Sequence, residues 1–311
     1  MTQPRITLVV TPRESFYHTE ASLESLLATV PAARIVYVDG GSPPWIATYL
    51  RKRSRQVPFE VIRVNRFLSQ NEGRNIALGH LPASDYVLFV DNDIVFAPGW
   101  YERLTACALE TGAGITAPLI CIGDPPFETV HFVSGVARID DTASGRRLHT
   151  EYHHAGRPLV AVSPLPRRES CEMVETHCML VRSDLLHGIG AFDEGLLSGN
   201  DHVDLSLRAR AVGATLYVEP AALVNQFLPR QLPDGWFDVP FFMRRWSAGW
   251  NRATIEHFRA KWDLRHDDPV LSTDARWLRD RWKHMFAPLA APFTQKLAPA
   301  LRRYLTPSFR K

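Results

Sequence analysis

Two carboxylates separated by one residue, Asp91-Asn92-Asp93, directly follow the apolar run Tyr86–Val90. Side chains placed this way past a buried strand reach one point in space, where two unpaired carboxylates repel each other. A divalent cation removes that repulsion, and hard oxygen ligands favour Mg²⁺ or Mn²⁺, which also bridge to phosphate oxygens. The pattern therefore predicts a metal site at Asp91 and Asp93 beside a phosphorylated ligand. A turn that caps a helix is the alternative, because a bare Asp-x-Asp is common.

The first hundred residues alternate between strand-like and helix-like patterns. Apolar, β-rich runs occur at Ile6–Val10, Ile35–Val38, Phe59–Val64 and Tyr86–Val90, with helical stretches between them. Continuous apolar strands separated by helices predict a mostly parallel sheet with helices on both faces. Ligands of such sheets bind beyond the carboxyl ends of the strands. The polar residues found there are Thr11, Arg13 and Glu14 after the first strand, Asp39 after the second and Asp91 after the fourth.

Composition narrows the class of protein. With 45% hydrophobic and 22% charged residues among 311, the chain is globular rather than disordered. Its 4 cysteines include no Cys-x-x-Cys pair, which argues against a disulfide framework or a zinc knuckle. No apolar run approaches the roughly 20 residues that span a bilayer, so we expect a cytoplasmic protein. We expect no nucleic-acid partner, because basic residues gather in residues 276–311 rather than on an aromatic-bearing sheet.

The chain resembles the glycosyltransferases of the GT-A fold, and within them family 2. Six segments in the family's order carry this resemblance over roughly residues 5–228: Ile6–Val10, Val38–Ser42, Asn71–Asn75, Tyr86–Asp93, Gly190–Glu194 and Asp201–Arg208. The resemblance implies an α/β fold, Rossmann-like, with a mostly parallel central sheet flanked by helices and a helical C-terminal extension. It implies a catalytic domain over residues 1–228, with a nucleotide-binding half (1–100) and an acceptor half (101–228), followed by a basic helical extension (229–311).

The activity that the resemblance implies is inverting, metal-assisted transfer of a hexosyl unit from a nucleotide-diphospho-sugar to an acceptor hydroxyl. UDP is the first candidate for the nucleotide, and a glycan or glycolipid of cell-surface polysaccharide synthesis is the expected acceptor. Mn²⁺ or Mg²⁺ held by Asp91 and Asp93 neutralises charge on the leaving diphosphate. The positions that match the family's nucleotide-sugar site are Thr11, Arg13, Glu14, Asp39, Asn71, Arg74, Asp91, Asn92 and Asp93.

The family's catalytic base usually lies in an acidic motif at a helix start, where this chain has Asp201-His202-Val203-Asp204-Leu205. The resemblance implies that Asp201 takes the proton of the acceptor hydroxyl. His202 is the alternative base, because imidazole also has a suitable ordinary pKa. Asp204 faces the same side of the helix and orients its neighbours or pairs with Arg208 one turn later. An acid-rich helix N-terminus without catalytic function is the other interpretation.

Two further features concern the metal and the acceptor side. Many relatives carry a His after the short strand, here Leu216–Val218, that follows this helix, whereas this chain offers Asn225 and Gln226. Amide oxygens bind hard cations weakly, so we expect the metal to be held mainly by Asp93 and the diphosphate. His177 is expected to contact either substrate. Trp246 belongs to an aromatic stripe that either packs in the core or stacks on a sugar ring.

A degenerate glycosyltransferase, which binds nucleotide or glycan without turnover, is the second hypothesis. The unusual His202 and the missing metal histidine motivate it. A nucleotidyltransferase is a third hypothesis, but Thr11-Pro12-Arg13-Glu14-Ser15 lacks the Gly-rich basic loop that such an enzyme needs.

The basic tail holds nine Lys and Arg against one acid over residues 276–311, whereas the whole chain has a net charge of only +3. Apolar residues fall at helical spacing among these cations, a pattern that suits an anionic membrane surface. We therefore expect peripheral binding to the inner face of the membrane. Packing of the apolar faces onto the body or onto a homodimer partner is an equal alternative.

Overall fold

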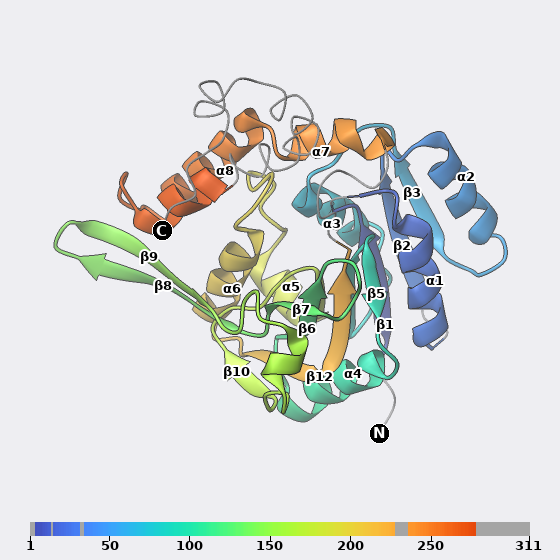
Figure 1. Cartoon of the computed structure of the whole chain (residues 1–311), viewed down its shortest axis with the longest axis horizontal. Helices are drawn as coiled ribbons and strands as arrows, with labels where there is room; N and C mark the ends of the chain where they lie inside the picture. The colour runs from blue at the N-terminus through green and yellow to red at the C-terminus, as the bar shows by residue number, and fades with distance from the viewer. Residues whose placement is uncertain (1–3, 14, 32–33, 228–235, 278–311) are drawn as a thin grey trace, which may run out of the picture.

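A central sheet of ten strands organises the part of the chain that the computed structural model describes, residues 4–13, 15–31, 34–227 and 236–277 (Figure 1). The elements of its first half alternate as β1 (Ile6–Thr11), α1 (Thr19–Thr29), β2 (Arg34–Gly40), α2 (Pro44–Arg53), β3 (Glu60–Val64), α3 (Gln70–Leu78) and β4 (Tyr86–Asp91). These four strands pair in parallel, which confirms the predicted α/β architecture. Their carboxyl ends therefore lie at one edge of the sheet.

The second half adds strands of mixed direction. It continues as β5 (Ile94–Phe96), α4 (Trp100–Thr111), β6 (Ile115–Ile122), β7 (Thr129–Phe132), β8 (Gly135–Thr142), β9 (Gly145–Tyr152), a 3₁₀ turn (Leu159–Val162), β10 (Glu169–Cys171), β11 (Cys178–Arg182), α5 (Ser183–Ile189), α6 (Asp201–Ala211) and β12 (Leu216–Gln226). The strand order is β10-β12-β6-β11-β4-β1-β2-β3, with β5 paired to β12 and β7 to β6. β11 runs antiparallel between β4 and β6, so the two halves share one sheet.

Helices cover both faces of the sheet. Successive side chains of a strand point to opposite faces, so Leu8 and Val10 pack with α1, α2 and α4. Val9, between them, packs with α3, α5 and α6 on the other face. Each fully buried apolar side chain contributes about 1.5–3 kcal/mol. Burial on both faces explains the continuous apolar sequences of β1, β2 and β4, whereas β3 is an edge strand of intermediate burial.

β12 is longer than its sequence pattern suggests. We expect a strand over Leu216–Val218, but the strand runs on to Gln226. Pro220 has no backbone N–H, and the register of β12 against β6 shifts just after Glu219. The strand continues beyond this irregularity, and Gln226 at its end lies next to Asp93 in the turn that follows β4.

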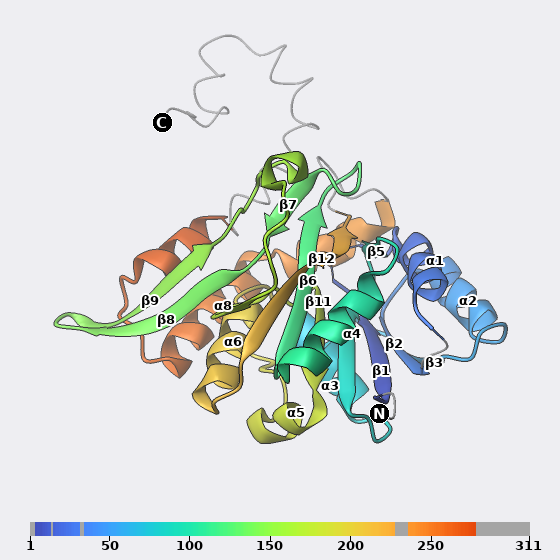
Figure 2. The same cartoon turned by 90° about the horizontal axis from the view of Figure 1, so that it is seen from below.

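The β8–β9 hairpin forms a separate two-stranded sheet that extends away from the central one (Figure 1 and Figure 2). It lies beside the segment that follows α8 (Ala248–Lys261). The backbone N–H of Leu148 donates to Asp268 at 2.8 Å, and Arg146 forms a parallel bridge with Leu264. The hairpin is therefore held by the C-terminal part of the described chain.

A 3₁₀ turn (Trp236–Asp238) and α7 (Val239–Arg245) pack against the loop between β1 and α1. Asp238 accepts the backbone N–H groups of Phe16 at 2.8 Å and Tyr17 at 3.1 Å, and the hydroxyl of Ser15 also donates to it. The ring of Phe241 packs on that of Phe16, with centroids 5.0 Å apart. The shape of the β1–α1 loop thus depends on a segment far along the chain.

The division of the chain at residue 228 remains a prediction. Residues 278–311, with their expected membrane-binding or packing faces, lie outside the described residues. Among the helices that the structure does describe, none combines the length and the apolar character needed to cross a membrane.

Asp193 anchors α8 and gives this contact a pH dependence. Burial raises the pKa of Asp193, but Lys261 at 2.6 Å and His257 at 2.8 Å outweigh it and bring the pKa to about 2. The folded state therefore prefers the ionised carboxylate. The ionised carboxylate of Asp193 stabilises the folded state fully above its unfolded-state pKa of about 3.9. This stabilisation is lost as the pH falls toward the folded-state pKa of about 2.

We therefore expect Asp193→Asn to destabilise the protein more at about pH 5 than at about pH 3, because over that range the unfolded wild-type chain takes up a proton at Asp193 whereas the folded protein keeps the carboxylate ionised. Urea unfolding of both proteins at the two pH values measures the difference. An equal loss of stability at both would contradict this role of the Asp193 charge.

Candidate active site

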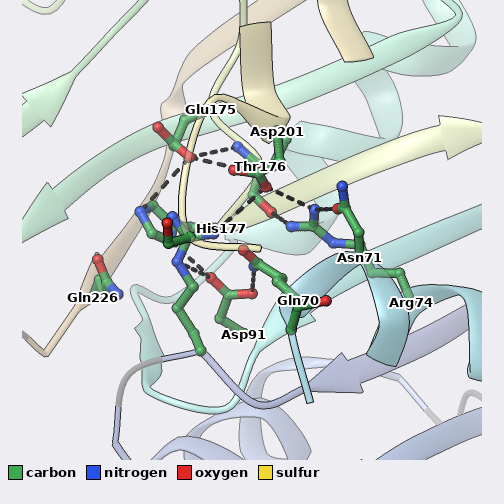
Figure 3. A network of polar contacts seen from close by, with 12 residues as sticks. Gln70, Asn71, Arg74, Asp91, Glu175, Thr176, His177, Asp201 and Gln226 are labelled. Atoms are coloured by element: carbon green, nitrogen blue, oxygen red, sulfur yellow. Dashed lines mark hydrogen bonds and ion pairs between the residues drawn. The ribbon is translucent and has the colours of Figure 1, made fainter. Parts of the chain in front are cut away.

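Asp91 ends β4 at the carboxyl edge of the sheet, with 1% of its surface exposed. Its Oδ1 accepts from the Gln70 amide, and its Oδ2 accepts from Nδ1 of His177 at 2.6 Å (Figure 3). Nε of Arg13 lies 3.8 Å from Oδ2. Asp91 is thus oriented by side chains from three separate segments. The sequence pattern did not reveal Gln70, although it directly precedes the Asn71–Asn75 segment.

Asp201, at the start of α6, belongs to the same network (Figure 3). Its Oδ2 accepts from Nη1 of Arg74 and Oγ1 of Thr176, both at 2.9 Å, and Nη1 of Arg13 lies 3.6 Å away. Burial raises the pKa of Asp201, but the guanidinium groups of Arg13 and Arg74 outweigh burial and hold it far below its usual range. A carboxylate stabilised in this way is a poor proton acceptor.

Arg74 is 0% exposed and joins α3 to α6. Besides pairing with Asp201, it donates to Oδ1 of Asn71 at 3.0 Å and to the carbonyl of Thr176 at 2.8 Å. Its guanidinium also lies over the ring of Phe192, 5.3 Å from the centroid. The structure therefore brings five of the predicted site residues together: Arg13, Asn71, Arg74, Asp91 and Asp201.

Asn92 shapes the β1–α1 loop. Its Oδ1 accepts the backbone N–H of Arg13 at 2.9 Å, and its Nδ2 donates to the carbonyl of Ser15 at 2.8 Å and to Oγ1 of Thr19 at 3.1 Å. Thr11, 1% exposed, ends β1 at the same edge. Glu14, the remaining predicted residue of this loop, lies outside the described residues.

Asp93 is 0% exposed and lies in the turn after β4. Nε2 of Gln226 is 3.5 Å from its Oδ2, whereas Asn225 bonds to backbone groups. Carboxylate and amide oxygens are ligands that Mn²⁺ or Mg²⁺ accepts. The residues thus fit the expected cation through Asp93, with Gln226 beside it. Metal ligation by Asp91, whose two oxygens already accept hydrogen bonds, stays a prediction.

Asp39 is 2% exposed and lies near the end of β2. It forms an ion pair with Arg63 of β3 and accepts the backbone N–H of Ser42 at 3.1 Å. A cavity of about 830 Å³ opens at the ends of β2 and β3 and is lined by Gly41, Arg63, Asn65, Arg66, Phe67, Ser69, Glu72, Leu197, Arg244 and Trp250. No sequence motif marks Arg63 as the partner of Asp39.

A second cavity of about 450 Å³ opens beside the Asp91–Asp201 network. Its volume lies in the range of small-molecule sites, roughly 300–1,000 Å³. Predicted site residues that line it are Arg13, His177, Asp201, His202 and Trp246, and Gln226 joins them. Trp246 is 3% exposed and also belongs to the apolar cluster of α7 and α8, so it both packs in the core and borders the cavity.

His202 borders this cavity from the first turn of α6. Its Nε2 lies 3.3 Å from the hydroxyl of Tyr152, 50 residues earlier. Asp274 lines the same cavity, and burial raises the pKa of Asp274 to about 6. Tyr152 and Asp274 reach the site only through the hairpin and the C-terminal segment, so no sequence motif marks them.

Asp204, in contrast, is not among the residues that line this cavity. Its Oδ1 accepts from Nε1 of Trp262 at 3.0 Å and lies 2.6 Å from Nζ of Lys261. The predicted pair with Arg208 is present at 3.5 Å. Asp204 therefore joins α6 to α8.

Residues 18–154 match the sequence model of glycosyl transferase family 2. This part of the chain is similar to that family. A pre-mycofactocin glycosyltransferase of Mycobacterium tuberculosis is 26% identical over 231 residues, which are 74% of this chain and 44% of that protein. The succinoglycan biosynthesis protein ExoA of Rhizobium meliloti is 23% identical over 240 residues, 76% of this chain and 65% of that protein. The chain thus spans less than half the length of the first relative.

The crystal structure of GalNAc-T7 with UDP, GalNAc and Mn²⁺ superposes with a TM-score of 0.56 at 14% identity, over 94% of this chain and 57% of that structure. At this level of identity the likeness concerns the fold. It confirms the GT-A fold.

Proposed function

We propose that this chain is a metal-assisted, inverting glycosyltransferase of family 2, which moves a hexosyl unit from a nucleoside-diphosphate sugar to an acceptor hydroxyl. The observation that carries the proposal is the convergence of Arg13, Arg74, Asp91 and Asp201 on one edge of the sheet, next to a cavity of about 450 Å³. Ligands of parallel sheets bind at this edge.

The donor is expected to lie along this edge, with Asp39, Asn71, Asp91 and Asp93 among the residues that hold it. Arg13 brings a guanidinium into the cavity, and guanidinium groups bind phosphate oxygens well. A divalent ion at Asp93 would supply charge neutralisation at the leaving diphosphate. The GalNAc-T7 structure, which contains UDP and Mn²⁺, supports this choice of ligands.

For the base we favour His202 over Asp201. Asp201 is committed to Arg74, Thr176 and Arg13, and the lowered pKa of this buried carboxyl leaves it a poor proton acceptor. His202 borders the cavity where an acceptor would lie, and imidazole is a common general base. Asp201 then acts as a positioning residue that fixes Arg13 and Arg74. The acceptor class that we propose is a glycan or glycolipid, which the name of the ExoA relative supports.

The test is a panel of UDP-, GDP- and dTDP-sugars with Mn²⁺, with release of nucleoside diphosphate as the readout. We expect slow donor hydrolysis for one nucleotide class and thermal stabilisation by the same donor. Once an acceptor is found, the anomeric configuration of the product, measured by NMR, should be inverted. Stabilisation without turnover would favour the degenerate binding protein instead, and neither effect with any donor would overturn the proposal.

A further inference from the structure

Two histidines and a glutamate converge on the wall of the 450 Å³ cavity. His131 comes from β7, and Glu175 and His177 come from the segment before β11. Nε2 of His131 lies 3.2 Å from one oxygen of Glu175, and Nε2 of His177 lies 3.7 Å from the other. One ligand atom from each residue lies within 4.8 Å of the others. Glu175 and His177 are 4% and 3% exposed.

We infer that His131, Glu175 and His177 bind a divalent transition-metal ion. Metal–nitrogen and metal–oxygen bonds of about 2.1 Å in tetrahedral geometry place neighbouring ligand atoms about 3.4 Å apart. The two separations, 3.2 and 3.7 Å, each to a different oxygen of Glu175, lie on either side of that value. His131 has 32% of its side chain exposed, so its ring can adjust to the ion from the open side.

Asp91 fixes the tautomer and the orientation of the His177 ring. A carboxylate only accepts hydrogen bonds, so the 2.6 Å contact places the imidazole proton on Nδ1. In the neutral ring, Nε2 then carries the lone pair, and this nitrogen is the one that faces Glu175. A carboxylate that orients a ligating histidine from behind is the usual arrangement at metal sites.

This site and the one expected at Asp93 differ in their ligand atoms, because only this site offers imidazole nitrogens. Two imidazoles with one carboxylate suit Zn²⁺, Co²⁺ or Mn²⁺, whereas Mg²⁺ prefers oxygen alone. Three protein ligands leave at least one position of the ion for a substrate oxygen in the cavity. The binding inference stands on these three residues and does not depend on the proposed function.

The test is titration of the full chain, without a histidine tag and freed of metal by chelation, with Co²⁺ and Zn²⁺ in the absence of any donor. We expect one Co²⁺ per chain, with the visible absorption of a low-coordinate nitrogen-ligated site, and displacement by Zn²⁺. His131→Ala should weaken binding at least tenfold. Asp91→Asn should weaken it about 10- to 100-fold, because it removes the partner that orients His177.

Two control variants make the result specific. His149→Ala removes an exposed histidine that also contacts a glutamate, Glu151, at 3.0 Å, and should bind Co²⁺ as the wild type does. Asp93→Asn should likewise keep the Co²⁺ spectrum. Loss of the spectrum in Asp93→Asn with retention in His131→Ala would overturn the inference, as would a wild-type protein that takes up neither ion. Because no sugar transfer is measured, failure here leaves the proposed transferase activity untouched.

Discussion

Arg74→Ala is expected to lower the free energy of unfolding by about 3–5 kcal/mol, the usual cost of breaking a buried ion pair from one side. Arg74 is 0% exposed, and its removal takes the hydrogen-bonded cation from the carboxylate of Asp201 and a donor from the carbonyl of Thr176. Arg13, at 3.6 Å, compensates only in part. Urea denaturation followed by tryptophan fluorescence measures the loss.

A matched control is available next to the same helix. Arg66 precedes α3 and pairs with Glu72 of that helix, but the Arg66 side chain is 58% exposed, so Arg66→Ala should cost less than about 1 kcal/mol. Arg74→Lys keeps the positive charge but not the forked geometry of the guanidinium. Its loss of unfolding free energy should lie between those of Arg74→Ala and Arg66→Ala. Equal unfolding midpoints for Arg74→Ala and Arg66→Ala would show that the buried network does not hold α3 to α6.

His202→Gln is expected to lower the turnover number of sugar transfer about 10²- to 10⁴-fold, the range that a general base contributes. Glutamine keeps a polar side chain near Tyr152 but cannot take a proton at neutral pH. Nucleotide binding should be unchanged, because His202 borders the cavity but is not bonded to the Arg74–Asp201 pair. Parallel measurements of donor affinity and transfer rate separate the two effects.

Asp201→Asn serves as the comparison for this assignment. We expect it to weaken donor binding and stability together, since an amide cannot balance the charges of Arg13 and Arg74. If Asp201→Asn instead keeps donor affinity and stability but loses transfer, while His202→Gln stays active, the base is Asp201. His149→Ala, on the exposed hairpin, should leave the rate unaffected.

The parallel half of the sheet could be predicted from the sequence because its information is local. Apolar runs alternate with helical stretches, and burial on both faces leaves a clear pattern. The full length of β12 was not predictable in this way, since Pro220 interrupts the apolar run and only pairing with β6 restores the strand. The antiparallel position of β11 between β4 and β6 was not predictable either, because it depends on pairing between strands that are distant in sequence.

The site was predictable where motifs follow strands or begin helices. Asp91, Arg74 and Asp201 lie in such motifs, and the structure brings them together. Glu175 and Gln70 carry no signal of their own, because their roles arise only from contacts with residues distant in sequence. Our proposal of His202 rather than Asp201 as the base rests on the contacts of Asp201 with Arg13 and Arg74, which the sequence alone does not show.

The contacts of Asp238 have a consequence for the order in which the protein can be completed during synthesis. The three groups that donate to Asp238 lie 221 to 223 positions earlier in the chain. The ribosome therefore releases all strands of the central sheet before it releases the residue that fixes the β1–α1 loop. We expect a nascent chain that ends before Asp238 to hold folded strands around a β1–α1 loop that lacks these three hydrogen bonds. We expect that such a chain binds a ligand at this loop only after residue 238 has been added.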